Sequence, residues 1–144
     1  MNNPDKTELA VGGCLCGAVR YEVRGRLRDI VACHCTQCRK STGHYYAATA
    51  ARRENFTLTE QRGLRWYRSS AAARRGFCGE CGSVLFWDNR EYPHISITAG
   101  SLYEPTDLVL VKHIFVAEKG DYYTIADGLP QVEGRGHGIA IPEG

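Results

Sequence analysis

The chain has 144 residues, of which 43% are hydrophobic and 24% charged, and its net charge is +2 at pH 7. This length suits one domain with its own core, and the composition excludes wholesale disorder. The chain has no run of about 18 apolar residues, the length that a membrane-spanning helix needs. The polar N-terminus lacks the apolar core of a secretory signal. The weak net charge argues against strong nucleic-acid binding.

Alternating apolar and polar residues predict a mainly β domain of antiparallel strands. We expect it over residues 10–132, between a polar N-terminal tail (1–9) and a Gly-rich C-terminal tail (133–144). Gln61-Arg62-Gly63 predicts the turn of a β-hairpin. In chain order, the predicted strands cover 19–23, 30–35, 47–53, 56–58, 64–66, 84–87, 94–98 and 108–116.

A short helix interrupts this pattern. Residues 36–41 predict one or two helical turns, with Thr36 as the N-cap residue.

Seven cysteines are the unusual feature of the composition. They occupy positions 14, 16, 33, 35, 38, 78 and 81. An odd number of cysteines without a secretory signal favours a reducing compartment, where such clusters bind metal more often than they form disulfides. We therefore expect a cytoplasmic, metal-binding protein.

The first and last cysteine groups predict one shared site. Cys14 and Cys16 are two apart, so on an extended chain they face the same side. Cys78 and Cys81 have the spacing of a zinc knuckle, and a glycine that can adopt positive φ follows each pair. Four sulfurs fit a closed tetrahedral zinc site. The alternative is disulfides, although a bond between Cys14 and Cys16 would be strained.

The middle group, Cys33-His34-Cys35 followed by Cys38, predicts a different kind of site. Cys33 and Cys35 face one side of an extended segment, Cys38 returns from the first helical turn, and His34 faces the other side. Three protein ligands leave one position of a tetrahedral zinc open, as in catalytic sites. Two alternatives are that His34 completes a second closed site and that the thiolates hold an iron–sulfur cluster.

Basic residues near these cysteines are candidate substrate contacts. Arg39 and Lys40 follow Cys38 directly and are predicted to bind an anionic substrate group, although they also suit a solvated face. Further arginines are predicted to form an exposed strand face, with a nucleic-acid surface as the alternative: Arg52, Arg53, Arg62, Arg65, Arg68, Arg74 and Arg75. The remaining histidines are predicted not to be ligands: His44, His94, His113 and His137.

Three cysteine-containing blocks together resemble one known family. Gly13–Gly17, Cys33–Lys40 and Phe77–Gly82 are similar to the signature blocks of the glutathione-dependent formaldehyde-activating enzyme family, whose superfamily includes the centromere protein V domain. The resemblance extends over about residues 10–132.

The resemblance implies an Mss4-like antiparallel β fold organised by two zinc ions per chain. The resemblance implies that a structural zinc is held by Cys14, Cys16, Cys78 and Cys81. It implies that a second, catalytic zinc is held by Cys33, Cys35 and Cys38. The implied activity is that of a carbon–sulfur lyase, which joins glutathione to formaldehyde as S-hydroxymethylglutathione. A non-catalytic zinc module that contacts nucleic acid or protein, and a zinc reservoir or thiol redox sensor, are the alternatives.

Overall fold

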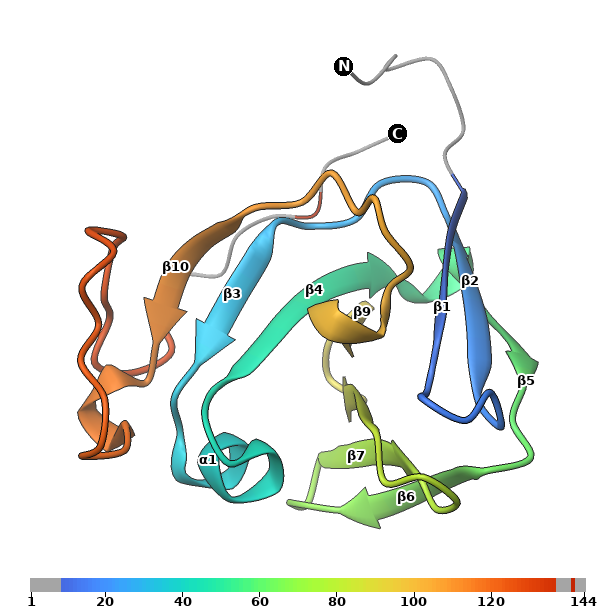
Figure 1. Cartoon of the computed structure of the whole chain (residues 1–144), viewed down its shortest axis with the longest axis horizontal. Coiled ribbons are helices and arrows are strands. Elements are labelled where there is room, and N and C mark those ends of the chain that lie inside the picture. Colours follow the sequence, from blue (N-terminus) through green and yellow to red (C-terminus); the bar gives the residue numbers. More distant parts are fainter. Residues whose placement is uncertain (1–8, 137–140, 142–144) are drawn as a thin grey trace.

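A computed structural model describes residues 9–136 and 141, and it confirms the mainly β class (Figure 1). The strands are β1 (Leu9–Gly13), β2 (Arg20–Arg24), β3 (Ile30–Cys33), β4 (Tyr46–Arg52), β5 (Phe56–Glu60), β6 (Leu64–Arg68), β7 (Ala73–Cys78), β8 (Val84–Asn89), β9 (His94–Thr98) and β10 (Leu110–Ile114). The helices are α1 (Thr36–Thr42) and the 3-10 turns η1 (Arg53–Asn55), η2 (Ala99–Ser101) and η3 (Val116–Glu118).

The strands form two sheets that enclose the main core. The small sheet has the order β1-β2-β5 and lies to the right of the curved large sheet, β10-β3-β4-β9-β8-β7-β6, in Figure 1. Among the described strands, all pairs are antiparallel except β10 with β3, which run parallel. Tyr21 and Val23 of the small sheet belong to the same buried cluster as Phe86 and Ile97 of the large one, so the predicted alternation in β2 supplies a core face.

The predicted hairpin around residues 61–63 is wrong. β5 pairs with β2, whereas β6 pairs with β7 in the other sheet. The backbone of Gly63 explains the crossing, because its N–H donates to the carbonyl of Ala18 at 2.9 Å and its carbonyl accepts from Gly79 N–H at 2.7 Å. These bonds attach the connection to the loops that carry cysteines.

The predicted helix is confirmed as α1, but its predicted N-cap is wrong. Cys35 is the cap: its backbone is extended, and its sulfur accepts a hydrogen bond from the backbone N–H of Cys38 at 3.4 Å. Thr36 lies inside the helix, and its N–H and hydroxyl both donate to the Glu118 carboxylate at 3.0 Å. Strand β3 consequently ends at Cys33, before the predicted end at residue 35.

Part of the predicted C-terminal tail packs on the body of the protein. Phe115 N–H donates to the carbonyl of Gly134 at 2.9 Å, and the Arg135 guanidinium lies 5.2 Å from the centre of the Tyr92 ring. Residues 1–8 of the N-terminal tail and His137 lie outside the described residues. Among the described helices, none is long and apolar enough to cross a membrane. The boundaries of the domain stay a prediction.

Candidate metal centres

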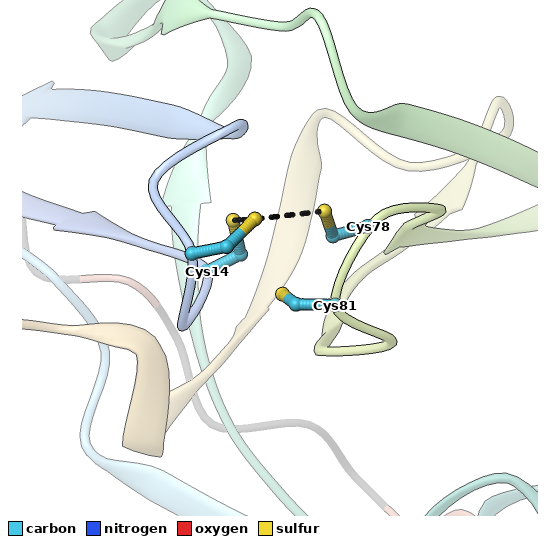
Figure 2. A group of neighbouring side chains, drawn as sticks. Cys14, Cys78 and Cys81 are labelled. Carbon is cyan, nitrogen blue, oxygen red and sulfur yellow. Dashed lines mark hydrogen bonds between the residues drawn. The ribbon is translucent and has the colours of Figure 1, made fainter.

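The first and last cysteine groups meet in one cluster, which we call the four-cysteine site: Cys14, Cys16, Cys78 and Cys81. Figure 2 shows Cys14, on the loop between β1 and β2, facing Cys78, the last residue of β7, and Cys81, in the β7–β8 connection. The sulfurs of Cys14 and Cys16 are 3.7 Å apart, those of Cys16 and Cys78 are 3.8 Å apart, and all four lie within 4.8 Å of one another. Zinc–sulfur bonds of about 2.3 Å in a tetrahedron place the sulfurs about 3.8 Å apart. The four side chains therefore fit one tetrahedral metal ion.

The backbone around the four-cysteine site favours ionised sulfur. Val19 N–H donates to Cys14 Sγ at 3.2 Å, and Glu80 N–H donates to Cys78 Sγ at 3.4 Å. Hydrogen bonds from the hydroxyl and the backbone N–H of Ser83 lower the pKa of Cys81 to about 5. Such bonds stabilise thiolates, the form that binds metal.

Glycines shape both loops as predicted. Gly17 has φ +86° and Gly82 has φ +81°, in the left-handed region that side chains with a Cβ avoid.

A Gly63→Ala variant should weaken the four-cysteine site. A methyl group at this position would lie 2.7 Å from Ala18 Cβ and 2.8 Å from Cys78 Sγ. Because the space is filled, we expect a loss of about 1–3 kcal/mol of unfolding free energy and reduced metal content. Denaturant unfolding with metal analysis measures both. Gly100→Ala, where no atom lies within 4 Å, is the matched control, and identical behaviour of the two variants would contradict the prediction.

The middle cysteine group forms a second cluster, which we call the three-cysteine site: Cys33, Cys35 and Cys38. Their sulfurs lie within 4.8 Å of one another. The pKa of Cys35 is lowered, first by hydrogen bonds from the Cys33 and Cys38 thiols and also by the charge of Arg75. The site can therefore hold a thiolate, and three sulfur donors suit a metal ion with one position left for an outside ligand.

The His34 side chain faces away from the three-cysteine site, as predicted from its position between Cys33 and Cys35. It is fully buried; a hydrogen bond of 2.6 Å joins its Nδ1 to Tyr123 Oη, and one of 2.9 Å joins its Nε2 to His113 Nδ1. His113 Nε2 in turn bonds Asp127 Oδ2 at 2.8 Å. Both ring nitrogens of His34 are engaged, so the structure excludes the alternative that His34 is a fourth ligand. The sequence reasoning did not foresee this chain of hydrogen bonds.

A cavity of about 530 Å³, which we call the sheet cavity, adjoins the three-cysteine site. Its walls include all three cysteines of that site and side chains from one face of the large sheet, such as Trp87 and Tyr46. Arg28, Arg75 and Arg135 line it together with one carboxylate, that of Glu118. The cavity is therefore suited to an anionic molecule.

The basic residues predicted near the cysteines do not all lie where the sequence analysis expects them. Arg39 and Lys40 are not among the residues that line the sheet cavity, and Lys40 is exposed; their contact with substrate stays a prediction. The expected exposed face is wrong for Arg75, which is 9% exposed. Its Nη2 donates to Cys38 Sγ at 3.5 Å and to Gln37 Oε1 at 3.3 Å.

Other arginines of the same stretch are paired with acids. Arg53 and Arg74 contact Asp88 at 2.6 and 3.0 Å, and Arg62 contacts Glu80 at 3.0 Å. These pairs offset much of the positive charge that a nucleic-acid surface would need.

The fold and the two clusters define a mainly β protein that can hold two metal ions on cysteine sulfur, one of them beside a basic cavity. The family model described as glutathione-dependent formaldehyde-activating enzyme matches residues 9–118, and the chain belongs to this family. This chain is 25% identical over 118 residues to an uncharacterized lyase of Schizosaccharomyces pombe. The aligned residues cover 81% of this chain and 85% of the yeast protein. The family and this relative support a lyase-type function related to thiols.

A solved structure has a similar fold. The crystal structure of a protein from Rhodobacter sphaeroides superimposes with a TM-score of 0.58 at 24% identity, covering 84% of this chain and 98% of that one. At this identity the likeness extends to the fold alone.

Proposed function

We propose that the protein is a zinc-dependent carbon–sulfur lyase that joins a thiol such as glutathione to a small aldehyde such as formaldehyde. The observation that carries the proposal is the three-cysteine site in the wall of the sheet cavity, with His34 turned away from it. Three protein ligands leave a tetrahedral zinc one position for an outside sulfur. In this proposal the four-cysteine site holds a structural zinc.

The chemistry needs an ionised thiol next to a carbonyl group. Cys33, Cys35 and Cys38 would hold a zinc ion, whose positive charge would keep a substrate thiol ionised near neutral pH. The sulfur electron pair forms the carbon–sulfur bond, the carbonyl π pair moves to oxygen, and the proton lost by the thiol ends on that oxygen as a hydroxyl. The reverse reaction breaks the same bond.

The residues of the sheet cavity bind and orient the thiol substrate. Arg28 and Arg135 supply positive charge for the carboxylates of a molecule such as glutathione, and the ring of Trp87 covers part of the apolar wall. The Arg75 guanidinium, through its bond to Cys38 Sγ, offsets the negative charge of the sulfurs. Positioning of the two reactants in this way contributes to the rate without new chemistry.

The Cys38→Ser variant tests the proposed function. We expect the wild-type protein to contain two zinc ions, to bind glutathione, and to form the glutathione–formaldehyde adduct faster than the spontaneous reaction. Cys38→Ser should keep one zinc ion and lose this rate increase, because a hydroxyl is a poor replacement for a zinc-bound thiolate. Elemental analysis, calorimetric glutathione titration and exchange NMR measure the three quantities.

The matched control for this test is Ser41→Ala in the same helix. Among the described residues, the Ser41 hydroxyl bonds only the carbonyl of Cys38, at 3.2 Å, so the variant should keep both zinc ions and the wild-type rate. Turnover by Cys38→Ser equal to that of Ser41→Ala would refute the proposed role of the three-cysteine site.

A further inference from the structure

Two buried polar groups beside the three-cysteine site have no partner within the described part of the protein. They are the hydroxyl of Tyr46 and Nη1 of Arg75. Tyr46 is 4% exposed and Arg75 is 9% exposed, and both side chains line the sheet cavity. A buried donor without an acceptor is costly, and such groups call for an explanation. A ligand oxygen that accepts hydrogen bonds from both donors would explain why they lack a partner in the protein.

The fold brings these donors to the sulfur ligands from two different strands. Tyr46, on β4, is the cross-strand neighbour of Cys33 on β3, so the two side chains share one face of the sheet. Arg75, on β7, donates through Nη2 to Cys38 Sγ at 3.5 Å, which leaves Nη1 free. The Arg75 guanidinium carbon lies 5.9 Å from the centre of the Tyr46 ring. Both side chains therefore line the same cavity as the three sulfurs, where a thiol would react in the proposed function.

The charges of the pair suit an oxygen anion. The guanidinium of Arg75 is permanently positive. Burial, followed by the neighbouring Cys38, raises the pKa of Tyr46, so its hydroxyl keeps its proton and acts as a donor at neutral pH. Both groups are buried, and low-dielectric surroundings strengthen hydrogen bonds to an anion.

We propose that Tyr46 and Arg75 form the oxyanion site of this protein and that they bind the oxygen of a small aldehyde. The inference rests on the proposed function. As the sulfur electron pair forms the carbon–sulfur bond, the carbonyl π pair moves to oxygen, and the Tyr46 hydroxyl and Arg75 Nη1 donate hydrogen bonds to the resulting alkoxide. The proton released by the thiol then neutralises that oxygen. Donors aimed at developing charge stabilise the transition state more than the ground state.

A binding experiment tests the donors without turnover. Mercaptoacetate carries a carboxylate close to its sulfur, whereas ethanethiol has only a methyl group there. We expect the zinc-loaded wild-type protein to bind mercaptoacetate about 10-fold more tightly than ethanethiol, and this ratio to fall about 5-fold or more in Tyr46→Phe and in Arg75→Gln, since each loses a hydrogen bond to an anion. Calorimetric titration measures both ligands.

The neighbouring residues provide matched controls. Tyr45→Phe removes the same hydroxyl from a ring that lies against His34. Arg74→Gln removes the same charge from a side chain that lies over the Trp66 ring at 3.8 Å. Both controls should keep the wild-type ratio. A ratio that is unchanged in Tyr46→Phe and Arg75→Gln would overturn the oxyanion site, because the carboxylate would then be bound elsewhere in the cavity.

Kinetics and stability of Tyr46→Phe provide the second test. We expect kcat for adduct formation to fall about 10- to 100-fold and the dissociation constant for glutathione to stay unchanged. The melting temperature should stay equal or rise, because the lost hydroxyl has no partner among the residues that the structure describes. A merely structural tyrosine would leave kcat unchanged.

The outcomes separate the two proposals. Turnover in the wild-type protein with an equal kcat in Tyr46→Phe overturns the oxyanion site alone. Absence of turnover in the zinc-loaded wild-type protein overturns the proposed function, and the ratio of mercaptoacetate to ethanethiol affinity still decides whether Tyr46 and Arg75 bind an oxygen anion.

Discussion

A Cys78→Ser variant is expected to lose the metal ion proposed for the four-cysteine site and, with it, most of the free energy of folding. Cys78 is fully buried, at the junction of the loops that join both sheets. Because metal binding at such a site is part of the folding free energy, we expect a loss of about 4 kcal/mol or more, a large share of the 5–15 kcal/mol typical of a domain. Circular dichroism during denaturant unfolding and elemental analysis measure the effect.

The matched control for Cys78→Ser is Glu80→Gln in the same loop. The Glu80 side chain is exposed and bonds only Arg62, at 3.0 Å, among its described ion-pair partners, so this variant should unfold like the wild-type protein and keep its metal. A folded Cys78→Ser protein of wild-type stability would show that the four-cysteine site does not hold the two loops together.

The arrangement within each cysteine group was predictable because it is local, whereas the meeting of Cys16 with Cys78 joins positions 62 residues apart and was predicted from the number of sulfurs that a closed zinc site needs. Residues two apart on an extended chain share a side, and a C-x-x-C spacing closes over a tight turn. Cys33, Cys35 and Cys38 converge as these rules require, and His34 turns the other way. What remains a proposal is the identity and role of the metal ions.

The walls of the sheet cavity depend instead on contacts between distant segments. Tyr46 reaches Cys33 through the register of β3 with β4, and Arg135 comes from a segment predicted to be a tail. One local signal was available: Arg74 and Arg75 are adjacent in a strand, so they must face opposite sides. One of them therefore had to point inward, but only the sheet order shows that Arg75 points to the sulfurs.

The parallel pairing of β10 with β3 has a consequence for the three-cysteine site. It places His113 of β10 beside Ala32 of β3, one position before the first cysteine of that site. The segment that follows β10 supplies Tyr123 and Asp127, which complete the hydrogen bonds around His34. The C-terminal part of the chain thereby supports the cysteines from the side opposite the cavity, and His34 is the connection.

His34→Ala is therefore expected to destabilise the protein strongly and to loosen the three-cysteine site. The change leaves the Tyr123 hydroxyl and one nitrogen of His113 without their partners and opens a cavity at a fully buried position. Together these effects should cost about 3–5 kcal/mol of unfolding free energy. The affinity for the metal ion proposed at the three-cysteine site should fall as well, because His34 lies between Cys33 and Cys35 in the chain. Denaturant unfolding and metal titration measure the two effects.

The pH dependence of the unfolding free energy distinguishes loss of the titrating His34 ring from simple loss of packing. Burial lowers the pKa of His34 to about 4, below the ordinary value of about 6.5. The unfolded chain therefore takes up this proton first, so His34 contributes stability above pH 6.5 that is lost as the pH falls from 6.5 to 4. At equal metal content, His34→Ala should lack this part of the acid sensitivity. The control is His44→Ala, an exposed residue 4.4 Å from the Tyr123 ring. It should keep most of the acid sensitivity, because burial, and not the charge of His44, is the largest cause of the lowered pKa of His34. Equal acid profiles for the two variants would contradict a neutral, buried His34 as the connection between the C-terminal segment and the cysteines.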